Sequence, residues 1–242
     1  MNTIPDNRLQ ETEDAHVVNA LRKQAGMKVT SVWDLVNMKV PYPEAIPVLL
    51  EWLPKVRHPK VKEGIVRALT VKEARGVAGK FLVEEFLRVD APSQEPRFAH
   101  IPRGRYGEWL QEPTLEERYL VWLWHLKWAI GNALGYVADA SVIHDVIALL
   151  RDRRHGGTRS QLVWALVRLC PPETEAVVLE LLDDEDDGVA IQAALAAGRL
   201  GLQSAREKIA QRFLNHRDSW MRQQAKRALA KLDRARSQAK RE

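Results

Sequence analysis

Apolar residues recur at helical spacing through the C-terminal half of the chain. In the last such stretch the apolar or small positions are Met221, Ala225, Ala228, Leu229 and Leu232, with charged or amide side chains between them. Spacing of i, i+4, i+7, i+8 and i+11 is typical of a helix that buries one face. The pattern therefore predicts an amphipathic α-helix whose other faces meet water.

The same pattern occurs four times at a nearly constant interval. The aligned small residues are Ala133, Ala165, Ala196 and Ala228, separated by 32, 31 and 32 positions. A preceding apolar helix completes each unit, and its closing pair recurs at the same interval, as Leu149-Leu150, Leu181-Leu182 and Phe213-Leu214. Repeated pairs of short helices predict an α-solenoid in which each hairpin packs only on its neighbours.

The pattern divides the chain into three parts. Residues 1–40 are expected to form an N-terminal helical cap with residues 1–15 frayed, residues 41–233 the solenoid, and residues 234–242 a basic, disordered tail. Residues 88–117 interrupt the solenoid, because they contain Pro92, Pro96, Pro102, Pro113, Gly104 and Gly107. Ala68 precedes Ala133 by two periods, so one second helix is expected to be missing. The aromatic residues of the insertion, Phe98, Tyr106 and Trp109, are expected either to fill that space or to form a partner-binding lid, and flexible disorder of the insertion is the third alternative.

The repeated unit resembles a HEAT repeat. An apolar helix ending in a Leu-Leu type pair is followed by a loop with Asp218 and by a helix that runs from Met221-Arg222 to Ala228-Leu229 and Leu232. The likeness covers about residues 43 to 232, and the whole organisation is similar to uncharacterised bacterial HEAT-repeat domain proteins. The resemblance implies an all-α, right-handed solenoid of about five to six helical hairpins, one of them degenerate. HEAT-like folds serve scaffolds, nucleic-acid binders and a few enzymes, so the resemblance alone does not choose among these functions.

Composition narrows the class of protein. The chain of 242 residues is 45% hydrophobic and 29% charged, which is typical of a folded globular protein. No apolar run approaches the length of a membrane span, and the N-terminus lacks a basic stretch followed by an apolar one. We therefore expect a cytoplasmic protein. The net charge is +5, and residues 215 to 242 hold nine Lys or Arg against three Asp or Glu, so the excess is local.

A candidate binding surface remains once the core positions are assigned. Fixed offsets from the first apolar residue of each second helix place eight candidates on the face away from the core, which is the concave face if the resemblance holds: Trp128, Asn132, Tyr136, Trp164, Arg168, Arg199, Arg227 and Lys231. Interleaved aromatic and guanidinium groups suit a protein or acidic peptide, or a nucleic acid. Ile191 and Leu195 share these rows and favour a protein. The alternative is a solvated basic face with its aromatic residues packed between helices.

The sequence gives little sign of a metal site or of a catalytic site. A basic cluster occupies one loop (Arg151, Arg153, Arg154, His155 and Arg159) and the acidic run 183–187 the next, but the acidic spacing matches no calcium loop, so no metal is expected. No histidine is followed by Glu, and His58 and His155 are expected to be loop caps; phosphate-loop and nucleophile motifs are absent. The sequence predicts a non-catalytic scaffold without cofactor or membrane contact. The alternative is a nucleic-acid binder, including a DNA glycosylase-like enzyme by analogy of fold.

Overall fold

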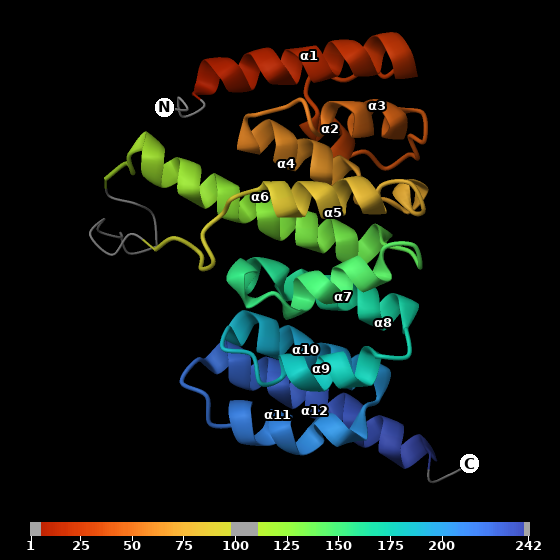
Figure 1. Ribbon diagram of the computed structural model, residues 1–242, viewed down its shortest axis with the longest axis vertical. Helices are drawn as coiled ribbons and strands as arrows, with labels where there is room; N and C mark the ends of the chain where they lie inside the picture. Colours follow the sequence, from red (N-terminus) through yellow and green to blue (C-terminus); the bar gives the residue numbers. More distant parts are fainter. Residues whose placement is uncertain (1–5, 98–110, 240–242) are drawn as a thin grey trace.

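The computed structural model describes residues 6–97 and 111–239, which form a curved stack of helices (Figure 1). This part of the chain contains twelve α-helices and three short 3-10 helices, and no strand. The α-helices are α1 Asn7–Ala25, α2 Trp33–Val36, α3 Ala45–Trp52, α4 Pro59–Ala68, α5 Gly79–Arg88, α6 Leu115–Val137, α7 Ile143–Arg151, α8 Val163–Leu169, α9 Thr174–Leu181, α10 Asp187–Leu200, α11 Arg206–Phe213 and α12 Ser219–Ala239. The 3-10 helices are η1 Lys72–Ala74, η2 Arg153–Leu162 and η3 Gln203–Ala205.

Helices α3 to α12 form five consecutive hairpins: α3 with α4, α5 with α6, α7 with η2 and α8, α9 with α10, and α11 with α12. The second helices pack on one another in sequence, from α4 through α6, α8 and α10 to α12. In Figure 1 they lie behind the first helices from the second hairpin onward. The predicted all-α solenoid is therefore confirmed, while its right-handedness remains a prediction.

The periodic small residues occupy the positions that the pattern gave them. Ala133, Ala165, Ala196 and Ala228 are all fully buried. Small side chains let neighbouring second helices approach closely. The approach is closest along α6, where a Cβ added at Gly131 would lie 2.8 Å from the carbonyl oxygen of Thr158. Any larger residue there would push η2 away from α6.

Helices α1 and α2 cover the N-terminal end of the stack, where the cap was expected. Val17 and Leu21 of α1 are fully buried, and α1 packs on α3 and α4. The Glu13 carboxylate also accepts a hydrogen bond of 2.8 Å from the backbone N–H of His58. The helix ends at Gly26, which has a left-handed φ of 65°. The expectation of a frayed start was wrong for residues 7–15, because they are the first turns of α1.

The insertion lies inside the second hairpin and does not replace a helix. Helix α6 begins at Leu115, inside the expected insertion, with Thr114 and Glu117 forming a capping box, and it packs on both α4 and α5. The expectation of a missing or degenerate hairpin was therefore wrong, since α6 is the second helix of this repeat and a long connection simply precedes it. Phe98, Tyr106 and Trp109, expected to form a plug or a lid, lie outside the described residues.

The C-terminal segment is helical further than the sequence suggested. Helix α12 continues to Ala239, so the expected disordered tail was wrong for residues 234–239. Arg234 and Arg236 lie on this extension, beyond the last core residue, Leu232. The basic end of the chain is thus held in a fixed direction by the helix that closes the stack. This places Arg234 beside the candidate site.

Candidate functional site

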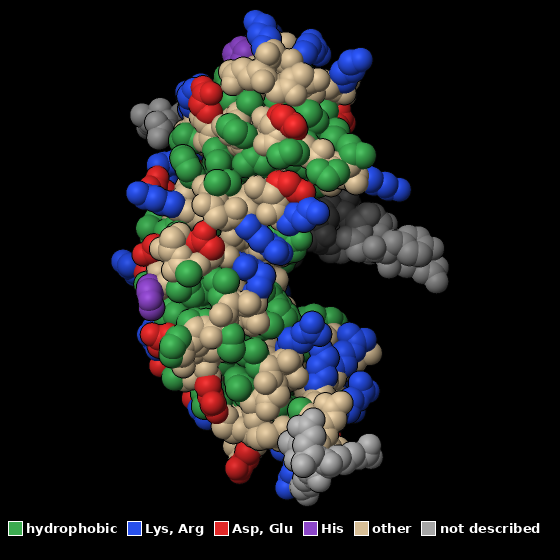
Figure 2. Space-filling view, turned by 90° about the vertical axis from the view of Figure 1, so that its right-hand side faces the viewer, with side chains coloured by type: hydrophobic (Ala, Val, Ile, Leu, Met, Phe, Trp, Pro, Cys, Tyr) green, Lys and Arg blue, Asp and Glu red, His purple; other side chains and the backbone are tan. Residues whose placement is uncertain are grey.

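The second helices line the hollow side of the molecule. Figure 2 shows that the stack curves and that Lys and Arg side chains gather around the hollow on the right of the view. Two adjoining depressions lie on α6, α8, α10 and α12, with volumes of about 620 and 440 Å³. They share Trp164 and Lys231. We call the two together the basic groove.

The larger depression is polar and the smaller one has an apolar floor. The larger is lined by Asn132, Gly135, Tyr136, Trp164, Val167, Arg168, Arg199 and Lys231. The smaller is lined by Trp164, Leu195, Gln224, Arg227, Ala230, Lys231 and Arg234. No acidic side chain is among these described lining residues. The groove therefore combines a hydrophobic surface with charged side chains that are all positive.

Seven of the eight candidate residues line the groove: Asn132, Tyr136, Trp164, Arg168, Arg199, Arg227 and Lys231. Trp128 does not, because it packs against the hydrophobic core one turn before Asn132. Of the two apolar residues on the same rows, Leu195 lines the groove, but Ile191 is fully buried. The expectation that Ile191 faces away from the core was wrong. The fixed offsets thus identify the side of each helix that faces the groove, but they do not show which residues mark the limits of the groove.

Trp164 lies at the junction of the two depressions. Its side chain is half-buried against the core, and its indole N–H donates a hydrogen bond of 3.1 Å to the Gln192 side-chain oxygen. Gly135 leaves room for it, since a Cβ at that position would be 3.3 Å from the Trp164 Cβ. Trp164 thus packs partly against the core and leaves part of its apolar ring open to the groove. Its orientation is fixed before anything binds.

Two arginines meet at the C-terminal end of α6. The Arg168 guanidinium donates hydrogen bonds to the backbone carbonyls of Gly135 and Ala138, and Arg75 donates one of 3.2 Å to the carbonyl of Tyr136. Exposed carbonyls at a helix C-terminus attract cations. Arg75 also lies over the Tyr136 ring, 4.6 Å from its centre. Burial, together with the charge of Arg75, lowers the pKa of Arg168.

The remaining cations of the groove have no opposite charge beside them. Within residues 6–97 and 111–239, no ion pair involves Arg199, Arg227, Lys231 or Arg234; Arg227 donates a hydrogen bond of 3.3 Å only to the Gln224 amide oxygen. Several other cations of the same hairpins are paired, as Arg206 is with Asp233 at 2.7 Å and Arg212 is with Asp187 at 3.0 Å. The groove therefore gathers several positive charges that have no ion-pair partner in the described part of the chain.

Comparison with known families agrees with this architecture. The sequence model for HEAT repeats matches residues 143–230. Residues 143–230 carry HEAT repeats. A search of curated proteins found no match. The matched HEAT segment runs from α7 into α12 and includes every groove residue except those of α6, Lys231 and Arg234.

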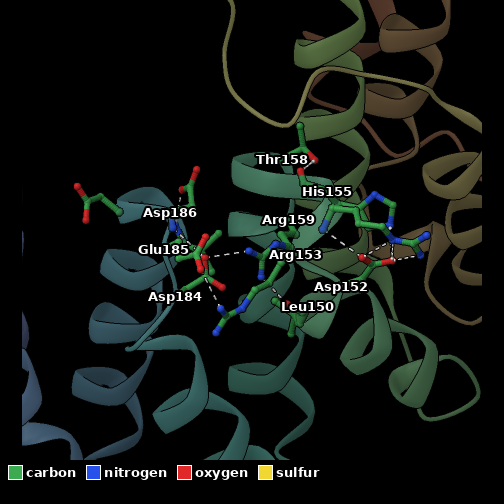
Figure 3. Close-up of polar contacts among 12 residues, drawn as sticks. Leu150, Asp152, Arg153, His155, Thr158, Arg159, Asp184, Glu185 and Asp186 are labelled. Atoms are coloured by element: carbon green, nitrogen blue, oxygen red, sulfur yellow. Dashed lines mark hydrogen bonds and ion pairs between the residues drawn. The ribbon is translucent and has the colours of Figure 1, made fainter.

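The charged loops of the HEAT hairpins neutralise one another. The basic cluster of one loop faces the acidic run of the next (Figure 3). Between the two loops, Arg153 pairs with Glu185 at 3.2 Å and Arg159 with Asp184 at 2.9 Å. Arg151 pairs with Glu180 of α9 at 2.7 Å, and Arg212 of α11 pairs with Asp187 at 3.0 Å. Asp186 instead caps α10 by accepting from the backbone N–H of Val189. Neither cluster is left as a separate binding site. In the described part of the chain, no group of three or more His, Cys, Asp or Glu side chains is arranged to hold a metal ion.

One of these pairs is almost completely buried. The side chains of Arg159 and Asp184 are 2% and 4% exposed. Arg159 also donates to the carbonyl of Leu150 at 2.6 Å, and Asp184 accepts from the backbone N–H of Asp186 at 2.9 Å. The pair therefore joins the third hairpin to the fourth within the core of the stack.

The two loop histidines differ in role. His58 caps α4, because its Nδ1 accepts a hydrogen bond of 3.2 Å from the backbone N–H of Lys60, as expected. His155 does not cap a helix; Asp152 does so at η2, and the His155 ring packs edge-on against Phe86 at 5.1 Å. The expectation that His155 is a cap was therefore wrong. A hydrogen bond from Arg154 lowers the pKa of Asp152 to about 2.

Folding stability should fall as the pH drops below about 6.5, the ordinary pKa of histidine. Burial lowers the pKa of both His58 and His155 in the folded chain, although Glu13 and Asp152 act in the opposite direction. Below pH 6.5 the unfolded chain therefore binds protons that the folded chain does not. Urea unfolding between pH 5 and 7.5 should show this slope, and His58→Asn, which keeps a capping side chain, should reduce it. An unchanged slope in that variant would contradict a contribution from His58.

Sequence reasoning missed four polar residues in or beside the site: Arg75, Gln192, Gln224 and Arg234. Arg75 follows η1 in a loop, where helical periodicity makes no prediction. Gln192 holds Trp164 from the neighbouring helix, which only the packing reveals. Arg234 was assigned to a disordered tail, although it follows Lys231 by three residues and continuing the helix would have placed both on one face.

In the described residues, no helix is both long and apolar enough to cross a membrane.

Proposed function

We propose that the protein is a non-catalytic scaffold whose basic groove binds an acidic segment of a partner protein. HEAT repeats generally mediate contacts between proteins in assemblies. The observation that carries the proposal is the set of cations without ion-pair partners around the groove: Arg199, Arg227, Lys231 and Arg234. Like charges held together repel one another, and a bound acidic chain relieves that repulsion.

The floor of the groove supplies a hydrophobic anchor point. Trp164, Leu195 and Ala230 line the smaller depression together. Binding energy in protein interfaces is concentrated where an aromatic or aliphatic side chain fills such a depression inside a polar rim. An acidic segment that carries one apolar residue would match both the floor and the rim.

The geometry favours a protein over a nucleic acid. Non-specific binding of single strands relies on open aromatic faces on which bases stack. In the groove, the Tyr136 ring lies under Arg75, and Trp164 is half-buried and tied to Gln192. The charge row also ends early, because Arg67 of α4 is paired with Glu63 at 2.7 Å. A short acidic segment fits this extent better than a long polyanion does.

Selection from a displayed library of random peptides should test the proposal. We expect the enriched peptides to combine Asp or Glu with an apolar residue. By fluorescence polarisation, the Arg199→Glu, Lys231→Glu variant should bind them at least about 30-fold more weakly, since both charges are reversed. Trp164→Ala should weaken binding about tenfold or more through loss of the anchor, while its folding stability falls by only about 1 to 2 kcal/mol.

The matched control is Arg217→Glu, Lys226→Glu, which makes the same change of net charge outside the groove. It should bind the selected peptides as the wild type does. Labelled single-stranded and duplex DNA should be titrated in parallel over a range of salt concentrations. Tighter binding of DNA than of any selected peptide, lost in the Arg199→Glu, Lys231→Glu variant, would overturn the proposal in favour of a nucleic-acid partner.

A further inference from the structure

The polar depression holds more positive charge than a single carboxylate can balance. Arg168, Arg199 and Lys231 come from three consecutive second helices and line the same space, with no acidic residue among the lining side chains. Among the described residues, the carboxylate that raises the pKa of Arg168 is Asp139, while burial and the charge of Arg75 lower it. An occupant with one negative charge would leave most of this charge unpaired.

The depression is also set up to receive several acceptor oxygens. Arg168 is held in place by the carbonyls of Gly135 and Ala138, so little side-chain entropy remains to be lost when it binds. The Asn132 amide and the Tyr136 hydroxyl line the same space, and neither makes a hydrogen bond with the described part of the chain. Two neutral donors thus stand beside three cations.

We propose that this depression binds a phosphorylated side chain of the partner segment, an inference that rests on the proposed function. A phosphoryl group carries about −1.5 to −2 charges at neutral pH and three strong acceptor oxygens, whereas a carboxylate carries one charge. Arginines that bind phosphate in two-point contacts give both strength and geometric selection. The adjoining depression around Trp164 and Leu195 then receives an apolar residue close to the phosphorylated one. Phosphorylation of the partner would control docking.

The first arm of the test uses small anions at constant ionic strength. Inorganic phosphate and O-phosphoserine should shift the side-chain NH resonances of Arg168 and Arg199 in ¹⁵N NMR spectra, and acetate should not. The Arg168 shift should vanish in Arg199→Gln, Lys231→Gln, and both shifts should persist in Arg217→Gln, Lys226→Gln, with the far-ultraviolet circular dichroism of both variants unchanged. Equal shifts with acetate, or none with phosphate, would overturn the inference.

The second arm uses the selected acidic peptides, with each Glu replaced in turn by phosphoserine. One replacement should tighten binding about tenfold or more, and the Arg199→Gln, Lys231→Gln variant should lose that gain. If peptides bind in the groove but no phosphoserine tightens binding, the inference fails while the proposed function stands. If phosphate binds but no peptide does, the proposed function fails, and the inference of a phosphorylated partner fails with it.

Discussion

Replacement of Arg159 by methionine is expected to destabilise the protein by about 3 to 5 kcal/mol. The change removes the partner of a carboxylate that is only 4% exposed, so Asp184 would stay buried with an unpaired charge. It also frees the carbonyl of Leu150, which accepts from Arg159 at 2.6 Å. Urea unfolding followed by circular dichroism measures the loss.

Two further variants show whether burial is the cause. Arg154 lies in the same loop and pairs with Asp152 at 2.6 Å, but its side chain is 87% exposed. Arg154→Met should therefore leave the free energy of unfolding nearly unchanged. Adding Asp184→Asn to Arg159→Met should recover part of the loss, because the uncompensated charge is then gone. A loss below about 1 kcal/mol in Arg159→Met would show that the pair does not join the hairpins.

Replacement of Phe86 by alanine should lower the free energy of unfolding by about 3 to 5 kcal/mol. Phe86 is fully buried, and its ring lies against residues of α6 and η2. The Lys127 amine lies 5.0 Å from the ring centre, and the His155 ring packs against its edge. Removal of the ring leaves a cavity beside a buried amine, whose pKa is already lowered by burial. Chemical denaturation gives the difference directly.

Phe81 is the matched control, because it lies on the same helix and is 44% exposed. Phe81→Ala should change the stability by about 0.5 kcal/mol or less. Phe86→Leu keeps most of the apolar volume and should lose less than Phe86→Ala does. Similar losses for Phe81→Ala and Phe86→Ala would mean that α5 does not present Phe86 to the core.

Periodicity predicted the stack because it reports which face of each helix is buried. Ala133, Ala165, Ala196 and Ala228 fix the register of the second helices, and seven groove residues follow from that register. It could not locate the insertion, because a count of residues between Ala68 and Ala133 does not tell a missing helix from a long connection. Nor could it show that Ile191 is buried, since a fixed offset ignores how each helix is rotated against its neighbours.

The charged clusters show a different limit of sequence reasoning. The basic residues around Arg153 and the acidic run around Glu185 look like two binding sites when they are taken along the chain. In space the two loops are adjacent, and their charges pair. In contrast, Arg199 stands alone in an apolar stretch and Lys231 is one of nine basic residues in 215–242, and only the packing shows that both line one depression without an acidic side chain. A site defined by uncompensated charge is a property of the fold.

Helices α5 and α6 pack directly on each other, although a long connection joins them in the sequence. Helix α6 is held in the stack by its contacts with α4, α5 and η2. Doubling the length of such a link raises its closure cost by only about 0.6 kcal/mol. The stack is thus divisible at this point into two complementary pieces, residues up to 97 and residues from 111. Evolution or an engineer could lengthen, cut or replace this connection with another domain while leaving the groove intact, because every residue that lines the groove belongs to the second piece and the first piece supplies Arg75, which lies over Tyr136.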